Sequence, residues 1–291
     1  MTLVQTKFVQ AEPPPHLTEP NTSTSALKRA LVLFAHSPSQ EAAYKPFRSS
    51  DASEKVHSAL LERTLEQIRV ANLHTSSETA FDLIIATDAP DRVAAMLFAS
   101  QNPHQSLLPV NIVFLRQTGE SFDERLNNTL SSASNLGYEH IVVVGADTPE
   151  MSACEIISAF AALSYNESTV VLGESTDGGV YLIGAASGSI AQLLANIRWQ
   201  SADVFADIVR NVAKHRFHTH FLRTLADMDT LADLVRWLHF SQDVSLTGLR
   251  RRLSAILLAS RIKTSFLPQS FPVLPRPKRL RLQMQKAPPL L

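Results

Sequence analysis

The chain has 291 residues, of which 45% are hydrophobic and 19% charged, with 27 basic and 27 acidic side chains. This composition predicts a folded, soluble globular protein and excludes a disordered polyelectrolyte. The single cysteine, Cys154, excludes an internal disulfide framework and a cysteine-rich zinc site. No apolar run approaches the roughly 18 residues of a transmembrane helix, so the expected location is cytoplasmic.

Charge and proline are distributed unevenly along the chain. Residues 241–291 carry ten Lys or Arg and one acid, a sum of +9, whereas residues 1–240 carry 17 basic and 26 acidic residues, a sum of −9. Four of the sixteen prolines fall within residues 13–20 and six within residues 268–289. We therefore expect a disordered segment over 1–25, a folded domain over 26–242, a basic amphipathic helix over 243–264 and a disordered, proline-rich basic tail over 265–291.

Within the expected domain, short runs rich in Val and Ile alternate with longer stretches of helical periodicity. In chain order, the predicted strands are 30–35, 81–87, 111–115, 140–144, 169–172, 180–183 and one around 217–222. The predicted helices include 54–70, 91–100, 122–136, 154–163, 201–214 and 231–240. This alternation predicts an α/β fold, a three-layer, Rossmann-like αβα arrangement around a mostly parallel sheet. Ligands of such sheets bind at the carboxyl ends of the strands, so functional residues are expected there.

The positions of glycine exclude two common phosphate-binding loops. None of the nine glycines precedes Gly119, no GxGxxG motif exists, and no pair of glycines with P-loop spacing is followed by lysine. Neither a dinucleotide-binding fingerprint nor a Walker motif is therefore available.

Acidic residues follow several of the predicted strands. Asp147 lies in GADTP (145–149), Asp177 in GESTDGGVYLIG (173–184), and Asp227 and Asp229 in LADMDT (225–230). Each motif also has a purely structural interpretation: a turn or helix cap for Asp147, a hairpin turn for Asp177 and its two glycines, and a helix N-cap for Asp229. If these carboxylates converge, they repel one another by several kcal/mol at an effective dielectric of about 20, and such a cluster usually needs a cation.

The order of five motifs resembles the bacterial GT-A-fold glycosyltransferases catalogued as domain of unknown function 2064. The motifs are Gln-x-Gly followed by Glu-Arg (117–125), then GADTP, GESTDGGVYLIG, IRWQS (197–201) and LADMDT, and the resemblance covers about residues 30–237. It implies a GT-A-like fold, a nucleotide-diphospho-sugar donor, an unknown acceptor, and a Mg²⁺ or Mn²⁺ ion on strand-end aspartates.

The resemblance also implies roles for individual residues. Asp147, Asp227 and Asp229 would hold the metal, and Asp177 would face the acceptor and take the proton from its hydroxyl. The donor and its phosphates would be contacted by residues from several loops: Lys45, Arg48, Asp88, Gln117, Arg125, Gly178 and Gly179. Asp88 could read the base of the nucleotide, although TDAP (87–90) is also an ordinary helix entry.

The loop after the first predicted strand departs from the family pattern. A glycine-containing loop that ends in Lys-Thr-Arg-Leu is replaced by HSPSQEAAYKPFR (36–48), which has no glycine. Lys45 and Arg48 keep two positive charges there, which could reach phosphate oxygens or could be solvated surface charges.

Two other functions stay open. One is a nucleotidyltransferase of the same superfamily, which is disfavoured because such enzymes usually carry a glycine-rich loop after the first strand. The other is a GT-A domain that binds a partner or ligand without catalysis, which the altered loop favours and the aspartates oppose.

The basic segment 246–263 also has two interpretations. Its basic residues are interleaved with Leu and Ile at helical spacing, which allows peripheral contact with an anionic membrane. The alternative, which we prefer, is a helix packed on the acidic body. No specific nucleic-acid partner is expected, because the tail has few interleaved aromatic residues.

Overall fold

The computed structural model describes residues 5–8, 27–76, 79–99 and 111–260. Its strands are β1 (Gln5–Phe8), β2 (Arg29–Phe34), β3 (Asp82–Thr87), β4 (Asn111–Arg116), β5 (His140–Val144), β6 (Thr169–Glu174), β7 (Val180–Ala186) and β8 (His218–Phe221). Its helices are α1 (Pro38–Tyr44), α2 (Ser50–His74), α3 (Pro90–Ala99), α4 (Phe122–Asn135), α5 (Ala153–Leu163), α6 (Ser187–Leu193), α7 (Val204–His215), α8 (Leu231–Phe240), the 3₁₀ helix η2 (Val244–Leu246) and α9 (Thr247–Ala259). The disorder expected for residues 1–25 and 265–291 concerns residues outside this description, except that residues 5–8 form β1.

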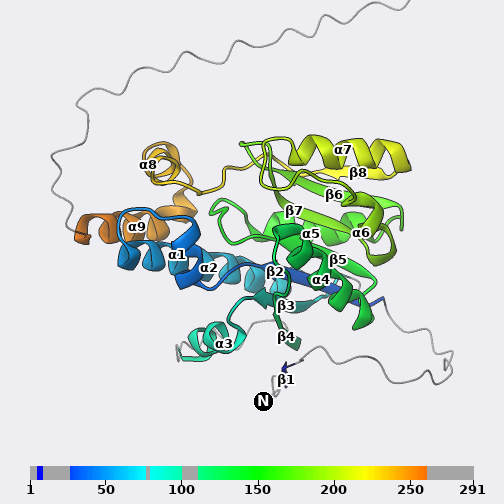
Figure 1. Cartoon of the computed structure of the whole chain (residues 1–291), viewed down its shortest axis with the longest axis horizontal. Coiled ribbons are helices and arrows are strands. Elements are labelled where there is room, and N and C mark those ends of the chain that lie inside the picture. The colour runs from blue at the N-terminus through cyan, green and yellow to red at the C-terminus, as the bar shows by residue number, and fades with distance from the viewer. Residues whose placement is uncertain (1–4, 9–26, 77–78, 100–110, 261–291) are drawn as a thin grey trace, which may run out of the picture. The chain divides into compact units, whose positions relative to one another are not determined.

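The described strands form one eight-stranded sheet in the order β1-β4-β3-β2-β5-β7-β6-β8 (Figure 1). Neighbouring strands are parallel except in the pairs β5–β7 and β6–β7, so β7 runs against the other strands. The expected α/β fold with a mostly parallel sheet is confirmed. The reversal of β7 follows from the short 175–179 loop after β6, because a parallel connection needs a crossover of a dozen or more residues.

Helices cover both faces of the sheet, which gives the expected three layers. Leu31 and Leu33 of β2 face one hydrophobic core, which they share with α2, α3 and α5. Ala30 and Val32 alternate with them and face a second core, shared with α4, α6 and α7. Because side chains of a strand alternate between its faces, a central strand buried on both sides needs apolar residues on both, as β2 has from Ala30 to Phe34.

A third hydrophobic cluster joins the last two helices to α2. Its buried members include Val56 and Leu60 of α2, Trp237 of α8, and Leu253 and Leu257 of α9. Figure 1 shows α9 alongside α2. This packing agrees with the interpretation in which the basic helix covers the body. No helix in the described part of the chain is long and apolar enough to cross a membrane.

The cationic side of α9 also contacts the body. Arg252 forms a two-pronged ion pair with Glu62 of α2, and the Arg250 side chain donates to the carbonyl of Leu238 at 3.0 Å. Two of the arginines that make this segment basic are therefore used in contacts between helices.

The glycine-free loop after β2 contains a short helix that the sequence pattern did not predict. Pro38 is the first residue of α1, where its fixed φ suits a helix and its missing N–H costs nothing. Glu41, Ala42 and Ala43 are good helix formers. A helix of seven residues is too short to give a clear periodic signal, which also explains why α6 was not expected.

Candidate active site

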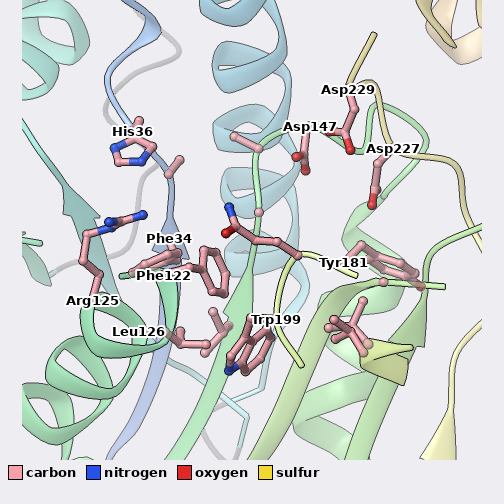
Figure 2. A pocket seen from close by; sticks show the side chains of 18 of the residues that line it. Phe34, His36, Phe122, Arg125, Leu126, Asp147, Tyr181, Trp199, Asp227 and Asp229 are labelled. Carbon is pink, nitrogen blue, oxygen red and sulfur yellow. The ribbon is translucent and has the colours of Figure 1, made fainter. Parts of the chain in front are cut away.

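A cavity of about 1000 Å³ lies at the carboxyl ends of β2 and β5, beside the hairpin of β6 and β7. Its volume suits a nucleotide-sized ligand, because ligand pockets span roughly 300–1,000 Å³. Figure 2 shows two chemically different ends, one with aspartates and one rich in aromatic side chains. Eight of the residues proposed from the sequence line it: Lys45, Gln117, Arg125, Asp147, Asp177, Gly179, Asp227 and Asp229. Arg48, Asp88 and Gly178 do not line it.

The aspartate end is assembled from two loops that are bonded to each other. Asp147 follows β5, and its backbone carbonyl accepts a hydrogen bond from the N–H of Met228 at 2.9 Å. The Met228 side chain is buried in the cluster of α2, α8 and α9. Asp227 and Asp229 flank this anchored residue, and both therefore reach the cavity next to Asp147 (Figure 2).

The N-cap expected at Asp229 lies one residue later. The Thr230 hydroxyl accepts from the N–H of Asp233, and Asp233 in turn accepts from the Thr230 N–H at 3.0 Å, which forms a capping box for α8. Asp229 is therefore not needed for capping. Similarly, Ser152 and Glu155 cap α5, which leaves the Asp147 carboxylate for other contacts.

Lys45 lies between the carboxylates. It directly follows α1, and its Nζ is 2.6 Å from Asp147 Oδ2, 2.6 Å from Asp229 Oδ1 and 3.4 Å from Glu41 Oε1. Two contacts hold its backbone. The Lys45 N–H donates a hydrogen bond to the Glu41 carbonyl at 2.8 Å, and the Lys45 carbonyl lies 3.0 Å from His57 Nε2. A lysine proposed from the sequence as a phosphate ligand is thus the cation of the aspartate cluster.

The proton affinities of these groups reflect their burial and their neighbours. Burial alone would lower the pKa of Lys45, but the carboxylates of Asp147, Glu41 and Asp229 raise this pKa well above its ordinary value. Burial opposes ionisation of Asp147, yet the Lys45 ammonium holds the pKa of Asp147 below its ordinary value. Burial, and then the charge of Asp147, raise the pKa of Asp227 to about 7.

The hairpin between β6 and β7 brings Asp177 to the cavity. Asp177 Oδ1 accepts from the Gly179 N–H at 2.9 Å, and Ser175 and Gly179 close the turn through a backbone bond of 3.0 Å. Gly178 has a φ of 93°, and a Cβ at this position would lie 2.1 Å from the carbonyl oxygen of Ala202. The hairpin interpretation of the DGG segment is therefore correct, and the same turn also presents Asp177 and Gly179 to the cavity.

An aromatic group lines the opposite end of the cavity, and sequence reasoning did not propose it as functional. The Phe34 and Phe122 rings meet edge to face at 5.6 Å, and Phe122 lies 5.1 Å from Trp199 between ring centroids (Figure 2). The signal for Phe34 was its position as the last residue of a buried strand. Trp199 belongs to the IRWQS motif, which was used only as a family landmark.

Ion pairs from two exposed arginines to one buried carboxylate hold the Trp199 loop in place. Asp207 of α7 is 2% exposed. Its carboxylate accepts two hydrogen bonds from the Arg198 guanidinium, at 2.7 and 2.8 Å, and one from the Arg198 backbone N–H at 3.1 Å. Arg210 adds a contact of 2.7 Å. Hydrogen bonds from Arg198 and then Arg210 keep the pKa of Asp207 well below its ordinary value.

Gln117 and Arg125 line the cavity beyond β4. The Gln117 amide nitrogen donates to the carbonyl of Ala86 at 2.9 Å, while its amide oxygen is buried without a hydrogen-bond partner among the described residues. The Arg125 guanidinium donates to the Glu120 carbonyl at 3.2 Å. Gln117 thus offers an acceptor to a ligand, and Arg125 offers a positive charge.

Arg48 and Asp88 have contacts away from the cavity. Arg48 donates to the Leu257 carbonyl of α9 at 3.4 Å. Asp88 accepts from the backbone N–H of Ser37 at 2.5 Å and from its hydroxyl at 2.9 Å, so it fixes the residue that precedes α1. Both side chains support the loop that carries Lys45, and neither of them lines the cavity.

A second, smaller cavity of about 410 Å³ adjoins the first between the hairpin and α8. Asp177, Asp227 and Asp229 line both cavities. The smaller cavity is also bordered by Trp237 and by Phe240, which is 77% exposed. The three aspartates therefore lie between two spaces that could each hold part of a substrate.

The chemistry of the aspartate end suits a hard divalent cation, because Mg²⁺ and Mn²⁺ bind carboxylate oxygens. Asp147 and Asp229 already direct one oxygen each at a common point, where the Lys45 ammonium stands. Within the described residues, no group of three or more acidic, His or Cys side chains is arranged to hold a metal ion. Asp147 and Asp229 thus supply the kind of oxygen that such an ion prefers, but the ammonium occupies the point on which they converge, so an ion could bind there only if the ammonium left.

Comparisons with known proteins agree with the sequence motifs. Residues 74–201 match the family described as "Uncharacterized protein conserved in bacteria (DUF2064)", which confirms the resemblance over this segment. No curated protein matches the sequence.

Among solved structures, a protein of Desulfovibrio desulfuricans G20, provisionally described as a nucleotide-diphospho-sugar transferase, is 21% identical with a TM-score of 0.61. The match covers 81% of this chain and all of that one. This similarity shows that the fold is GT-A-like.

Two weaker matches have TM-scores below 0.5, too low to support a conclusion about this chain. The Rv0371c protein of Mycobacterium tuberculosis H37Rv is 16% identical, with a TM-score of 0.45, over 74% of this chain and all of that one. Glucosyl-3-phosphoglycerate synthase of Mycobacterium tuberculosis, solved with Mn²⁺, UDP and glucosyl-3-phosphoglycerate, is 10% identical with a TM-score of 0.44. That match covers 84% of this chain and 86% of the synthase.

Proposed function

We propose that this protein transfers a glycosyl group from a nucleotide-diphospho-sugar to an unidentified acceptor. The observation that carries the proposal is the cavity at the carboxyl ends of the strands, which has aspartates and Lys45 at one end and aromatic side chains at the other. A nucleotide-sugar has the matching polarity, with a planar base at one end and a charged diphosphate bonded to a polar sugar.

The chain's own residues can bind and orient such a donor. Phe34, Phe122 and Trp199 provide apolar surface for a base or ribose, and the free Gln117 oxygen can accept a hydrogen bond from a base. Arg125 can neutralise phosphate oxygens. A divalent ion, when bound, would be held by Asp147, Asp227 and Asp229 and would stabilise the negative charge that develops on the leaving diphosphate.

Asp177 is the proposed proton acceptor. Its carboxylate is fixed by the Gly179 N–H and borders both cavities, so it can contact an acceptor hydroxyl in the smaller space and a sugar in the larger one. In the reaction, the acceptor oxygen bonds to the anomeric carbon while the bond from that carbon to the diphosphate oxygen breaks. The electron pair leaves with the nucleoside diphosphate, and the hydroxyl proton passes to Asp177.

A binding screen tests donor recognition. Nucleoside diphosphates and nucleotide-sugars are added to the full-length protein with and without Mn²⁺, and the melting temperature is measured, because a ligand of the native state raises it by mass action. Arg125→Gln should reduce the shift. Arg251→Gln should leave it unchanged, because Arg251 is exposed on α9 and does not line the cavity. No shift with any nucleotide would refute the proposal.

Product analysis distinguishes the three candidate activities. Glycosyl transfer releases a nucleoside diphosphate from a nucleotide-sugar, whereas nucleotidyl transfer releases pyrophosphate from a nucleoside triphosphate and a sugar phosphate. Binding without either release would favour a non-catalytic domain. Asp177→Asn should abolish release while the donor-induced shift in melting temperature persists.

A further inference from the structure

The position of the Lys45 ammonium is unusual for a residue that is expected to contact phosphate. It makes two ion pairs of 2.6 Å with aspartates from different loops, Asp147 and Asp229, and a longer one of 3.4 Å with Glu41. Its backbone is held at both ends of the residue, by Glu41 and by His57. The long side chain beyond this fixed backbone is the movable part.

The charges around the ammonium do not balance. Glu41, Asp147 and Asp229 supply three negative charges and Lys45 supplies one positive charge, which leaves a sum of −2 before Asp227 is considered. A divalent ion has the charge that this cluster needs. The ammonium nevertheless stands at the point on which two of the carboxylate oxygens converge, so both cations cannot occupy it together.

We propose that Lys45 is an internal competitor of the divalent ion, so that metal and diphosphate bind strongly only together. The proposal rests on the proposed function for the identity of the diphosphate. A metal that binds alone displaces the Lys45 ammonium from its three carboxylate partners into the cavity, where the ammonium finds no other anion, so the metal binds weakly. A diphosphate in the larger cavity provides that partner, because Lys45 lines this cavity together with Asp147 and Asp229.

This arrangement gives the glycine-free loop a function. Asp88 fixes Ser37 at the start of α1, and α1 carries both Glu41 and the approach to Lys45. A rigid helix in place of a glycine loop therefore delivers the lysine to the carboxylates. Since coupling between two ligands is reciprocal, diphosphate must strengthen metal binding by the same factor by which metal strengthens diphosphate binding.

The first experiment measures Mn²⁺ alone, by electron paramagnetic resonance of the free ion, on the full-length protein and two variants. Lys45→Met should bind Mn²⁺ at least about tenfold more tightly than wild type, a typical size for coupling between sites. Lys55→Met is the matched control, because Lys55 is exposed on α2 and pairs with Asp51; its Mn²⁺ affinity should equal that of wild type. Equal affinities for all three proteins would overturn the proposal.

The second experiment uses wild-type protein, so that it does not depend on the folding of a variant. Acetylation of each lysine is followed by mass spectrometry, with Lys55 as the internal reference. Lys45 should react slowly in buffer because its carboxylate partners stabilise the charged form. Saturating Mn²⁺ alone should accelerate its acetylation, and Mn²⁺ with a nucleoside diphosphate should slow it again. Unchanged acetylation on addition of Mn²⁺ would show that the ammonium is not displaced.

The outcomes separate this proposal from the proposed function. If Lys45→Met gains Mn²⁺ affinity but no nucleotide binds in the thermal screen, the competition between Lys45 and the metal stands, whereas its coupling to a diphosphate and the glycosyltransferase proposal both fail. If nucleotides bind but Mn²⁺ neither binds the variant more tightly nor exposes Lys45, the competition fails and donor binding stands.

Discussion

The packing of α9 on the body can be tested with two leucines of the same helix. Leu253 is 0% exposed in the cluster with α2 and α8, whereas Leu258 is 78% exposed. Leu253→Ala removes three buried carbon atoms at about 0.8 kcal/mol each and leaves a partly filled cavity, so the expected loss of stability is about 3 kcal/mol. Leu258→Ala should change stability by less than about 0.5 kcal/mol, because it removes few buried contacts and both residues favour helices.

Thermal unfolding followed by circular dichroism measures the difference. For a folded body of this size, 1 kcal/mol corresponds to roughly 2–4 °C in melting temperature, so Leu253→Ala should melt roughly 6–12 °C below wild type and Leu258→Ala within about 2 °C of it. If both variants had the same melting temperature as the wild type, α9 would not contribute to the stability of the folded body. A chain that ends before Leu246 should then also fold normally, whereas the packing observed predicts that it exposes Leu60 and Trp237 and aggregates.

Three further predictions concern the cavity walls. The native state holds a proton on Asp227 up to about pH 7, whereas the unfolded chain releases it near pH 3.8, so stability falls as pH rises through this window. Asp227→Asn should therefore be more stable than wild type at pH 8, by at most about 4 kcal/mol, and equal to it below pH 4; denaturant titrations at the two pH values test this. Gly178→Ala should lower the melting temperature, because its φ is 93° and an added Cβ would lie only 2.1 Å from the carbonyl oxygen of Ala202, whereas Gly188→Ala in α6 should be neutral or stabilising by up to about 1 kcal/mol. Asp207→Asn should release the Trp199 loop and weaken nucleotide binding, with a red shift in tryptophan emission; an unchanged spectrum and affinity would contradict the anchoring role.

The aspartates of the candidate site could be predicted from the sequence because a local rule places them. A carboxylate directly after a buried parallel strand lies at the edge of the sheet where ligands bind, whichever strands are neighbours. That rule put Asp147, which closely follows the buried strand β5, at the cavity, whereas Asp227 lies beyond the exposed edge strand β8 and was indicated by the family resemblance. Asp88 also follows a strand, but it lies outside the cavity and accepts from Ser37, and a hydrogen-bond partner 51 residues away is not visible in a local pattern.

The cationic centre of the site could not be predicted in the same way. The sequence indicated Lys45 and Arg48 as two equivalent positive charges on a loop. The structure directs Lys45 into the aspartates and Arg48 to the α9 carbonyl of Leu257. The separation arises because Lys45 directly follows α1, whereas Arg48 lies beyond it near the start of α2.

By itself, the sequence determined the periodicities of this protein: which of its longer segments are strands or helices, and that the central strands are buried on both faces. These features depend on residues within a few positions of one another. Only the tertiary structure decided that β7 runs antiparallel, that the basic helix α9 closes a core with α2 and α8, and that Lys45 meets Asp147 and Asp229. Each of these depends on contacts between segments far apart in the chain, where packing of apolar surface and pairing of charge outweigh local preference.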